Sequence, residues 1–140
     1  MTRALADAIS NINFGCITNA RTVTIKYSKH TYELCKILYD NGVIQGYSSM
    51  QTISNQLGIK NSVIRVEFKF RADTAFVKGI RRISRPGGRV YWNINALKRR
   101  IAHNNNVVIL STSRGMMTLK DAVLNNIGGE AICAVYMRGA

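Results

Sequence analysis

Three successive hydroxyl side chains occupy the segment best suited to chemistry. Ser111, Thr112 and Ser113 are followed by Arg114 and Gly115. A hydroxyl donates and accepts hydrogen bonds, so it can bind a ribose 2′-OH or a base edge, whereas a guanidinium binds phosphate through two parallel bonds. The segment lies between a β-branched run and a helix-capping signal, which predicts a loop that a ligand can approach closely. The alternative is a polar turn that satisfies only its own backbone.

A sharp turn precedes two adjacent aromatic residues. Arg85, Pro86 and Gly87 predict this turn, because proline fixes φ and glycine tolerates positive φ. Tyr91 and Trp92 follow on a returning strand, where the two-residue period predicts that one ring faces outward. An outward ring beside arginine can stack on an unpaired base. The alternative is that both rings belong to the core.

Basic side chains are concentrated in the middle of the 140-residue chain, which carries 20 Lys and Arg against 7 Asp and Glu and a net charge of +13. Residues 60 to 100 hold twelve basic and two acidic side chains, which gives +10 of that total. Such a density of like charge predicts an external polyanion, and the alternative is a solvated charged face. One stretch has no acid at all, and its bases are Lys78, Arg81, Arg82, Arg85, Arg89, Lys98, Arg99 and Arg100.

The sequence offers little evidence for a catalytic, metal-binding or membrane-spanning segment. The chain has two histidines, few acids, and no GxSxG, HExxH or GxxxxGK[ST] string, which argues against catalysis and a P-loop. Its three cysteines form no CxxC pair, which argues against zinc and a disulfide framework and fits a reducing compartment. Apolar runs of four or five residues are far shorter than the roughly 18 that span a bilayer. We therefore expect no catalytic residue, cofactor, metal, membrane or small-molecule substrate.

The hydrophobic pattern predicts an α/β (α+β) fold of two small domains. Residues 1–72 form an αβαββ unit. Its clearest elements are a helix over 3–13, a strand over 22–27, a helix that Ser28 can cap and that runs to about Asp40, where Gly42 is placed to end it, and an alternating strand from residue 64. We leave residues 48–61 as a variable hairpin or a protein contact. Residues 73–140 form a β-rich unit with short helices. Its expected strands cover 77–83, 89–92, 107–110 and 131–137, and its expected helices cover 95–102 and 118–126. Thr118, with Asp121 three residues later, resembles a capping box that opens the second of these helices.

Three strings resemble segments of the ribosomal small-subunit protein eight family, mostly of the bacterial type. They are ISRPGGRVY at 83–91, VILSTSRGMMT at 108–118 and GGEAICAV at 128–135. Their order and spacing match the family, and the similarity covers nearly the whole chain. The resemblance implies a structural constituent of the small ribosomal subunit that binds the central domain of its RNA, supports assembly and translation, and contacts neighbouring small-subunit proteins. Residues 73–140 are then the RNA-binding domain.

The resemblance also implies RNA contacts by matching position. Glu130 enters only in this way, because an acid is a poor phosphate ligand; its carboxylate can accept from a base amino group or orient the loop. The first helix lacks the arginines of the family pattern, which leaves Asn13 as its best candidate. Arg114 replaces the usual lysine. The full set of predicted contacts is Asn13, Arg85, Pro86, Gly87, Arg89, Tyr91, Ser111, Thr112, Ser113, Arg114, Gly115 and Glu130.

Two further questions have alternatives. A free-standing RNA-binding regulatory module that acts outside the ribosome is the second functional hypothesis. For the compartment, the 13 asparagines, the divergence from the family pattern and an N-terminus unlike a transit segment favour a mitochondrial ribosome. A plastid or a bacterial cytoplasm is the alternative.

Overall fold

Alternating apolar residues build two antiparallel sheets in the computed structural model, which describes residues 3–53, 60–101 and 106–137. The first sheet has the order β1-β3-β2, and the second has the order β6-β10-β8-β9 with β7 paired to β10. This confirms the mixed α+β class. The strands are β1 (Thr22–Lys26), β2 (Ile44–Ile53), β3 (Lys60–Phe68), β6 (Val77–Arg82), β7 (Tyr91–Trp92), β8 (Val107–Thr112), β9 (Gly115–Thr118) and β10 (Gly129–Met137).

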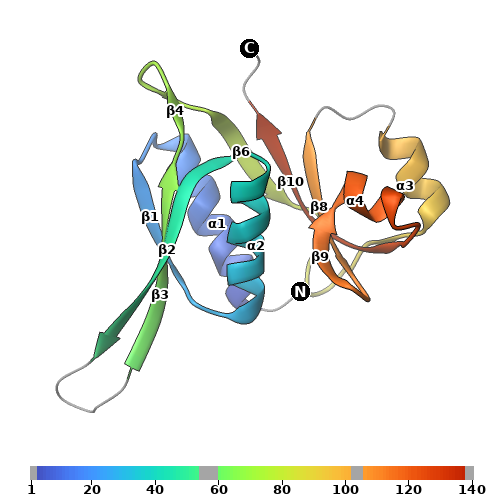
Figure 1. The fold of residues 1–140 in the computed structure, drawn as a ribbon, viewed down its shortest axis with the longest axis horizontal. Helices are drawn as coiled ribbons and strands as arrows, with labels where there is room; N and C mark the ends of the chain where they lie inside the picture. The colour runs from blue at the N-terminus through green and yellow to red at the C-terminus, as the bar shows by residue number, and fades with distance from the viewer. Residues whose placement is uncertain (1–2, 54–59, 102–105, 138–140) are drawn as a thin grey trace.

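Helices separate and flank these sheets as layers. From left to right, Figure 1 shows the first sheet, then helices α1 and α2, then the second sheet, and then α3 and α4. A core cluster of Ile9, Leu34, Ile64 and Ile109, among others, joins the first three layers, and a second cluster around Leu97 fills the space beneath α3 and α4. The second sheet is therefore covered on both faces. The helices are α1 (Arg3–Ile17), α2 (Lys29–Asp40), α3 (Ile94–Ile101) and α4 (Leu119–Leu124).

The proposed domain boundary at residues 72 and 73 lies in a small hairpin. Strand β4 (Phe70–Arg71) pairs with β5 (Thr74–Ala75) on either side of it, and Ala72 adopts a φ of 47°. The larger apolar cluster takes residues from both sides of this hairpin. The division into two domains stays a prediction.

Local signals fix the ends of the helices. Ser28 caps α2, since its side chain accepts from the Thr31 N–H while Thr31 Oγ1 accepts from the Ser28 N–H. Gly42 follows α2 with a φ of 71°, the left-handed conformation that ends helices. Thr118 caps α4 by accepting from the Asp121 N–H at 3.3 Å. These three predictions are confirmed.

Some predicted boundaries were wrong. Helix α1 continues to Ile17, four residues beyond its predicted end, because Gly15 and Cys16 are buried against the core. The strand expected over 89–92 is limited to Tyr91 and Trp92, where β10 offers a partner. Part of the 48–61 segment belongs to the β2–β3 hairpin, and its residues 54–59 lie outside the described chain. No helix among the described residues is long and apolar enough to cross a membrane.

The cysteines are buried within these layers. The side chains of Cys16, Cys35 and Cys133 each have no exposed surface. Burial disfavours the charged thiolate and raises the pKa of both Cys35 and Cys133 to about 12. Both thiols are therefore protonated at neutral pH.

Candidate nucleic-acid interface

Three strands of the second sheet bring predicted contact residues into one row. In the register, Tyr91 of β7 lies opposite Glu130 of β10, Glu130 lies opposite Ser111 of β8, and Ser111 lies opposite Met116 of β9. Directly opposed residues in antiparallel strands have their side chains on the same face. The pairing therefore gathers Tyr91, Glu130 and Ser111, which lie up to 39 positions apart in the sequence.

The hydroxyl segment is a β-hairpin, whereas the sequence predicted a loop leading to a helix. Thr112 pairs with Gly115, so that Ser113 and Arg114 form an exposed two-residue turn. Gly115 has a φ of 103°, which a side chain would strain. Strand β9 was missed because its Met116 and Met117 are not β-branched and it is only four residues long.

The three hydroxyls have different surroundings in this hairpin. Thr112 Oγ1 donates to the Gly115 carbonyl at 2.8 Å and accepts from the Arg114 N–H at 3.2 Å, so it holds the turn together. Ser111 is half-buried and Ser113 is exposed. The hairpin thus presents Ser113 and Arg114 at its tip on a backbone that Thr112 fixes.

The predicted turn after β6 is present and is braced from beneath. Backbone hydrogen bonds join Arg85 and Gly88 in both directions, at 3.2 and 3.0 Å, and leave Pro86 and Gly87 exposed at the tip. Ser84 is fully buried, and its Oγ accepts from the Val90 N–H at 2.9 Å. Sequence reasoning did not single out Ser84, although a polar residue beside a turn is a common backbone partner.

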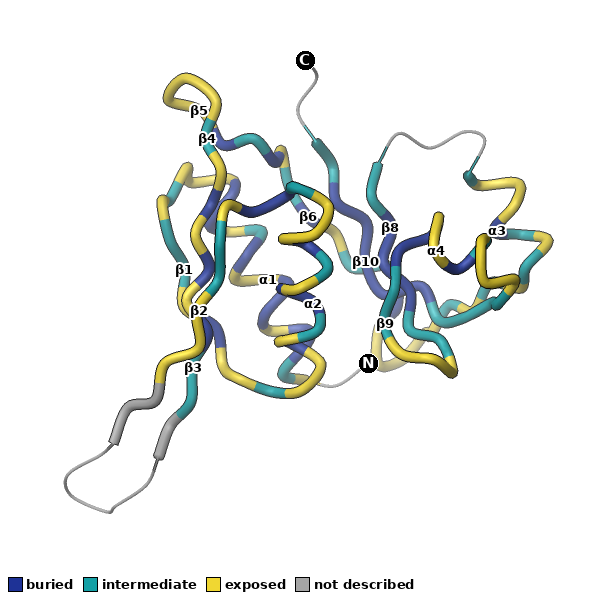
Figure 2. The backbone as a smooth tube through the Cα atoms, in the orientation of Figure 1, coloured by how far each residue is buried: buried dark blue, intermediate teal, exposed yellow. Residues whose placement is uncertain are grey.

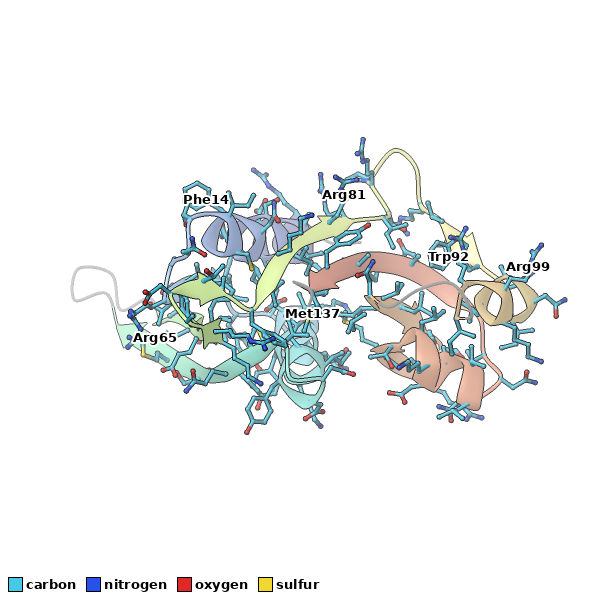
Figure 3. All side chains as sticks on the ribbon, turned by 90° about the horizontal axis from the view of Figure 1, so that it is seen from above. Phe14, Arg65, Arg81, Trp92, Arg99 and Met137 are labelled. Carbon is cyan, nitrogen blue, oxygen red and sulfur yellow. The ribbon has the colours of Figure 1, made fainter. Side chains whose placement is uncertain are left out.

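One of the two adjacent rings is exposed and the other packs against the core, as the two-residue period of a strand predicted. Tyr91 is 65% exposed, which confirms an outward ring. Trp92 packs against the second core cluster, and the Arg100 guanidinium lies 3.9 Å from the centre of its ring. Figure 3 shows Trp92 beside helix α3, from which Arg99 projects at the far end of the molecule. Tyr91 is therefore the ring available for stacking.

A cavity of about 270 Å³ opens beside the row. Arg89, Ser111 and Glu130 line it, and one carboxylate oxygen of Glu130, Oε1, is inaccessible to solvent. The N-terminal half also contributes, with Leu5 from α1 and His30 from α2. Figure 1 shows that α1 and α2 both begin at the lower side of the molecule, where the β8–β9 hairpin ends. Sequence reasoning missed both of these residues, because nothing local links position 5 or 30 to position 130.

Asn13 lies apart from this row. Its Oδ1 accepts from the Ile80 N–H at 3.1 Å, which attaches α1 to the edge strand β6. Gly79 permits this approach, since a Cβ there would lie 2.9 Å from the same oxygen. Asn13 lines a different cavity, of about 450 Å³, together with the exposed Lys78 and Arg81. Its predicted RNA contact stays a prediction, and the structure already gives the side chain a structural role.

Exposed basic side chains lie on several elements around the second sheet, and one of them, Arg89, lines the cavity beside the row. Figure 2 shows the buried backbone of β8 and β10 between exposed segments, which include the hairpin tip and the end of α3. Between residues 78 and 114, the exposed bases come from β6, the turn, α3 and the hairpin. They are Lys78, Arg81, Arg85, Arg89, Lys98, Arg99, Arg100 and Arg114.

Comparison with known proteins identifies the class to which this arrangement belongs. The family model described as Ribosomal protein S8 matches residues 3–136. The chain belongs to the ribosomal protein S8 family. Its relatives named small ribosomal subunit protein uS8 include one from Flavobacterium johnsoniae, 36% identical over 137 residues that cover 96% of this chain and 98% of the relative.

Other relatives also match over nearly the whole length of both chains. The protein uS8 of Dictyoglomus thermophilum is 33% identical over 136 residues, 97% of this chain and 98% of the relative. The protein uS8 of Malacoplasma penetrans is 33% identical over 132 residues, which cover 94% of this chain and 96% of the relative. These names assign the S8 family to the small ribosomal subunit, where its members are structural proteins. The chain is accordingly a small-subunit ribosomal protein, and it is located on the ribosome.

Proposed function

We propose that this S8-family chain binds the central domain of small-subunit ribosomal RNA as a structural protein, supporting subunit assembly and translation with neighbouring small-subunit proteins. The observation that carries the proposal is the row of Tyr91, Glu130 and Ser111 beside the hydroxyl hairpin. These groups offer a ring, an acceptor and a hydroxyl, which suit ribose and base edges. The exposed basic side chains supply attraction to phosphate that does not depend on sequence.

Filter binding to a central-domain RNA fragment tests the hairpin contact. Ser111→Ala and Ser113→Ala should each weaken binding about threefold to tenfold, the equivalent of one hydrogen bond worth about 0.5–1.5 kcal/mol. Ser48→Ala is the matched control, because Ser48 is exposed on β2 of the other sheet. If both hairpin variants bound as tightly as the control, the proposed contact would be wrong.

Salt dependence separates the two components of binding. Affinity should fall steeply as salt rises, because basic side chains release counterions from the RNA. Replacing Arg114 with Gln should reduce that slope by about one, whereas Ser113→Ala should lower affinity at every salt concentration and leave the slope unchanged. An equal change of slope in both variants would contradict this division of roles.

The compartment is a separate proposal. We assign the chain to a mitochondrial ribosome on its 13 asparagines and its divergence from the family pattern, although the relatives named above are bacterial. Immunoblotting of salt-washed ribosomes from purified mitochondria, with plastid and cytoplasmic ribosomes in parallel, tests it. Recovery only from another compartment would overturn the mitochondrial assignment.

A further inference from the structure

We infer that His30 contacts RNA, and that the cavity it shares with Arg89, Ser111 and Glu130 receives the sugar and base edge of one nucleotide. The inference rests on the proposed function and adds to it a residue from the N-terminal half. Position 30 lies 81 residues before Ser111 in the chain. Only the packing of α2 against the second sheet brings the two residues to one cavity.

The size and charge of the cavity indicate its ligand. Its volume of about 270 Å³ is slightly below the roughly 300–1,000 Å³ of sites for whole small molecules. It can therefore hold part of one nucleotide and excludes a duplex. Arg89 and Glu130 carry opposite charges, so the cavity has little net attraction for a phosphate group. Its hydroxyl, carboxylate and guanidinium instead match the donors and acceptors of a ribose 2′-OH and a base edge.

His30 is held by a rigid part of the fold. It lies between Lys29 and Thr31 in the first turn of α2, directly after the Ser28 cap. Thr31 is fully buried and its Oγ1 donates to the Lys26 carbonyl at 3.1 Å, which ties this turn to β1. The His30 side chain itself is exposed. The backbone that carries this imidazole is therefore fixed, and the ring can donate, accept or stack.

The first experiment measures the affinity of His30 variants for the central-domain fragment. His30→Leu should weaken binding about threefold to tenfold, and His30→Gln, which keeps a donor and an acceptor, should weaken it less. Tyr39→Leu is the control, because it removes another exposed ring from the opposite end of α2. The urea midpoint of His30→Leu should equal that of the wild type, because the side chain is exposed.

A double-mutant cycle tests whether the cavity acts as one site. His30→Leu and Ser111→Ala should lose less affinity together than the product of their separate losses, because either change spoils the same contact. The losses of affinity caused by His30→Leu and Arg99→Gln should instead multiply in the double variant, because Arg99 lies on α3, beyond the other face of the second sheet.

The outcomes separate the inference from the function on which it rests. Wild-type affinity in His30→Leu, alongside weakened binding in Ser111→Ala, would overturn the role of His30 and leave the hairpin contact intact. A lowered urea midpoint that accounts for the lost affinity would show a structural role and would also overturn it. Unchanged binding in both Ser111→Ala and Ser113→Ala would instead refute the hairpin contact.

Discussion

Gly129→Ala should damage the fold and the RNA site together. Gly129 begins β10, and a Cβ added there would lie 2.5 Å from the Ser111 carbonyl oxygen and 3.0 Å from Thr112 Cγ2. Because real Cβ atoms are not found closer than 3.0 Å, the Ser111 backbone must move by at least 0.5 Å, the difference between these distances. A backbone atom cannot rotate away as a side chain can.

The expected loss of stability is the balance of two opposing effects. Forcing a methyl group into a packed contact costs about 1–3 kcal/mol, whereas replacing glycine by alanine lowers the entropy of the unfolded chain and returns about 0.4–1 kcal/mol. The strain outweighs the entropic gain, so we expect a net loss of about 1–2 kcal/mol. A binding site must be held to within about 0.5 Å, so a displaced Ser111 should lower RNA affinity about tenfold.

Urea unfolding and filter binding measure these two effects. Gly46→Ala is the matched control, because Gly46 also lies in a strand and its added Cβ would meet only Glu67 Oε2, at 3.7 Å. This control should retain the wild-type midpoint or exceed it slightly, and should bind RNA normally. A Gly129→Ala variant with the midpoint and affinity of the wild type would refute the claim that β10 and β8 are too close for a side chain.

Two more predictions concern the core. Ellman's reagent should not label the native protein at pH 7–8, whereas it should label all three thiols in urea. Above pH 9 the free energy of unfolding should fall by about 1.4 kcal/mol per pH unit for each of Cys35 and Cys133. The reason is that these thiols lose their protons in the unfolded state before they do in the folded state. A slope unchanged by Cys35→Val would contradict this. Leu97→Ala, at a fully buried site, should cost about 2–5 kcal/mol in urea unfolding, whereas Leu124→Ala, at an 82% exposed site, should cost under about 0.5 kcal/mol. Similar losses in both would show that α3 is not anchored through Leu97.

Much of the fold could be predicted because its signals are local. The alternation of Ile64, Val66 and Phe68 with charged residues specified a strand with one buried face, and all three are buried. Ser28 and Gly42 marked the two ends of α2, because capping depends on residues within a few positions. The outward ring of Tyr91 followed from the same two-residue period.

The site was predictable in composition but not in arrangement. The hydroxyl segment, the turn and Tyr91 were recognisable by residue type, and Glu130 entered by resemblance alone. The bond from Thr112 to Gly115 spans only three positions, but no local pattern showed that Asn13 attaches α1 to β6. A sequence shows which groups can form hydrogen bonds, whereas the partner that such a group finds can lie far away in the sequence.

The sequence by itself determined a basic, mixed α+β member of a ribosomal protein family, because charge, periodicity and short motifs are properties of neighbouring residues. Tertiary structure alone decided which residues meet. The register of β7, β10, β8 and β9 placed Tyr91, Glu130 and Ser111 in one row. The packing of α2 then brought His30 to the same cavity. Such contacts depend on strand pairing and core packing between segments up to 100 residues apart, and a local pattern carries no record of them.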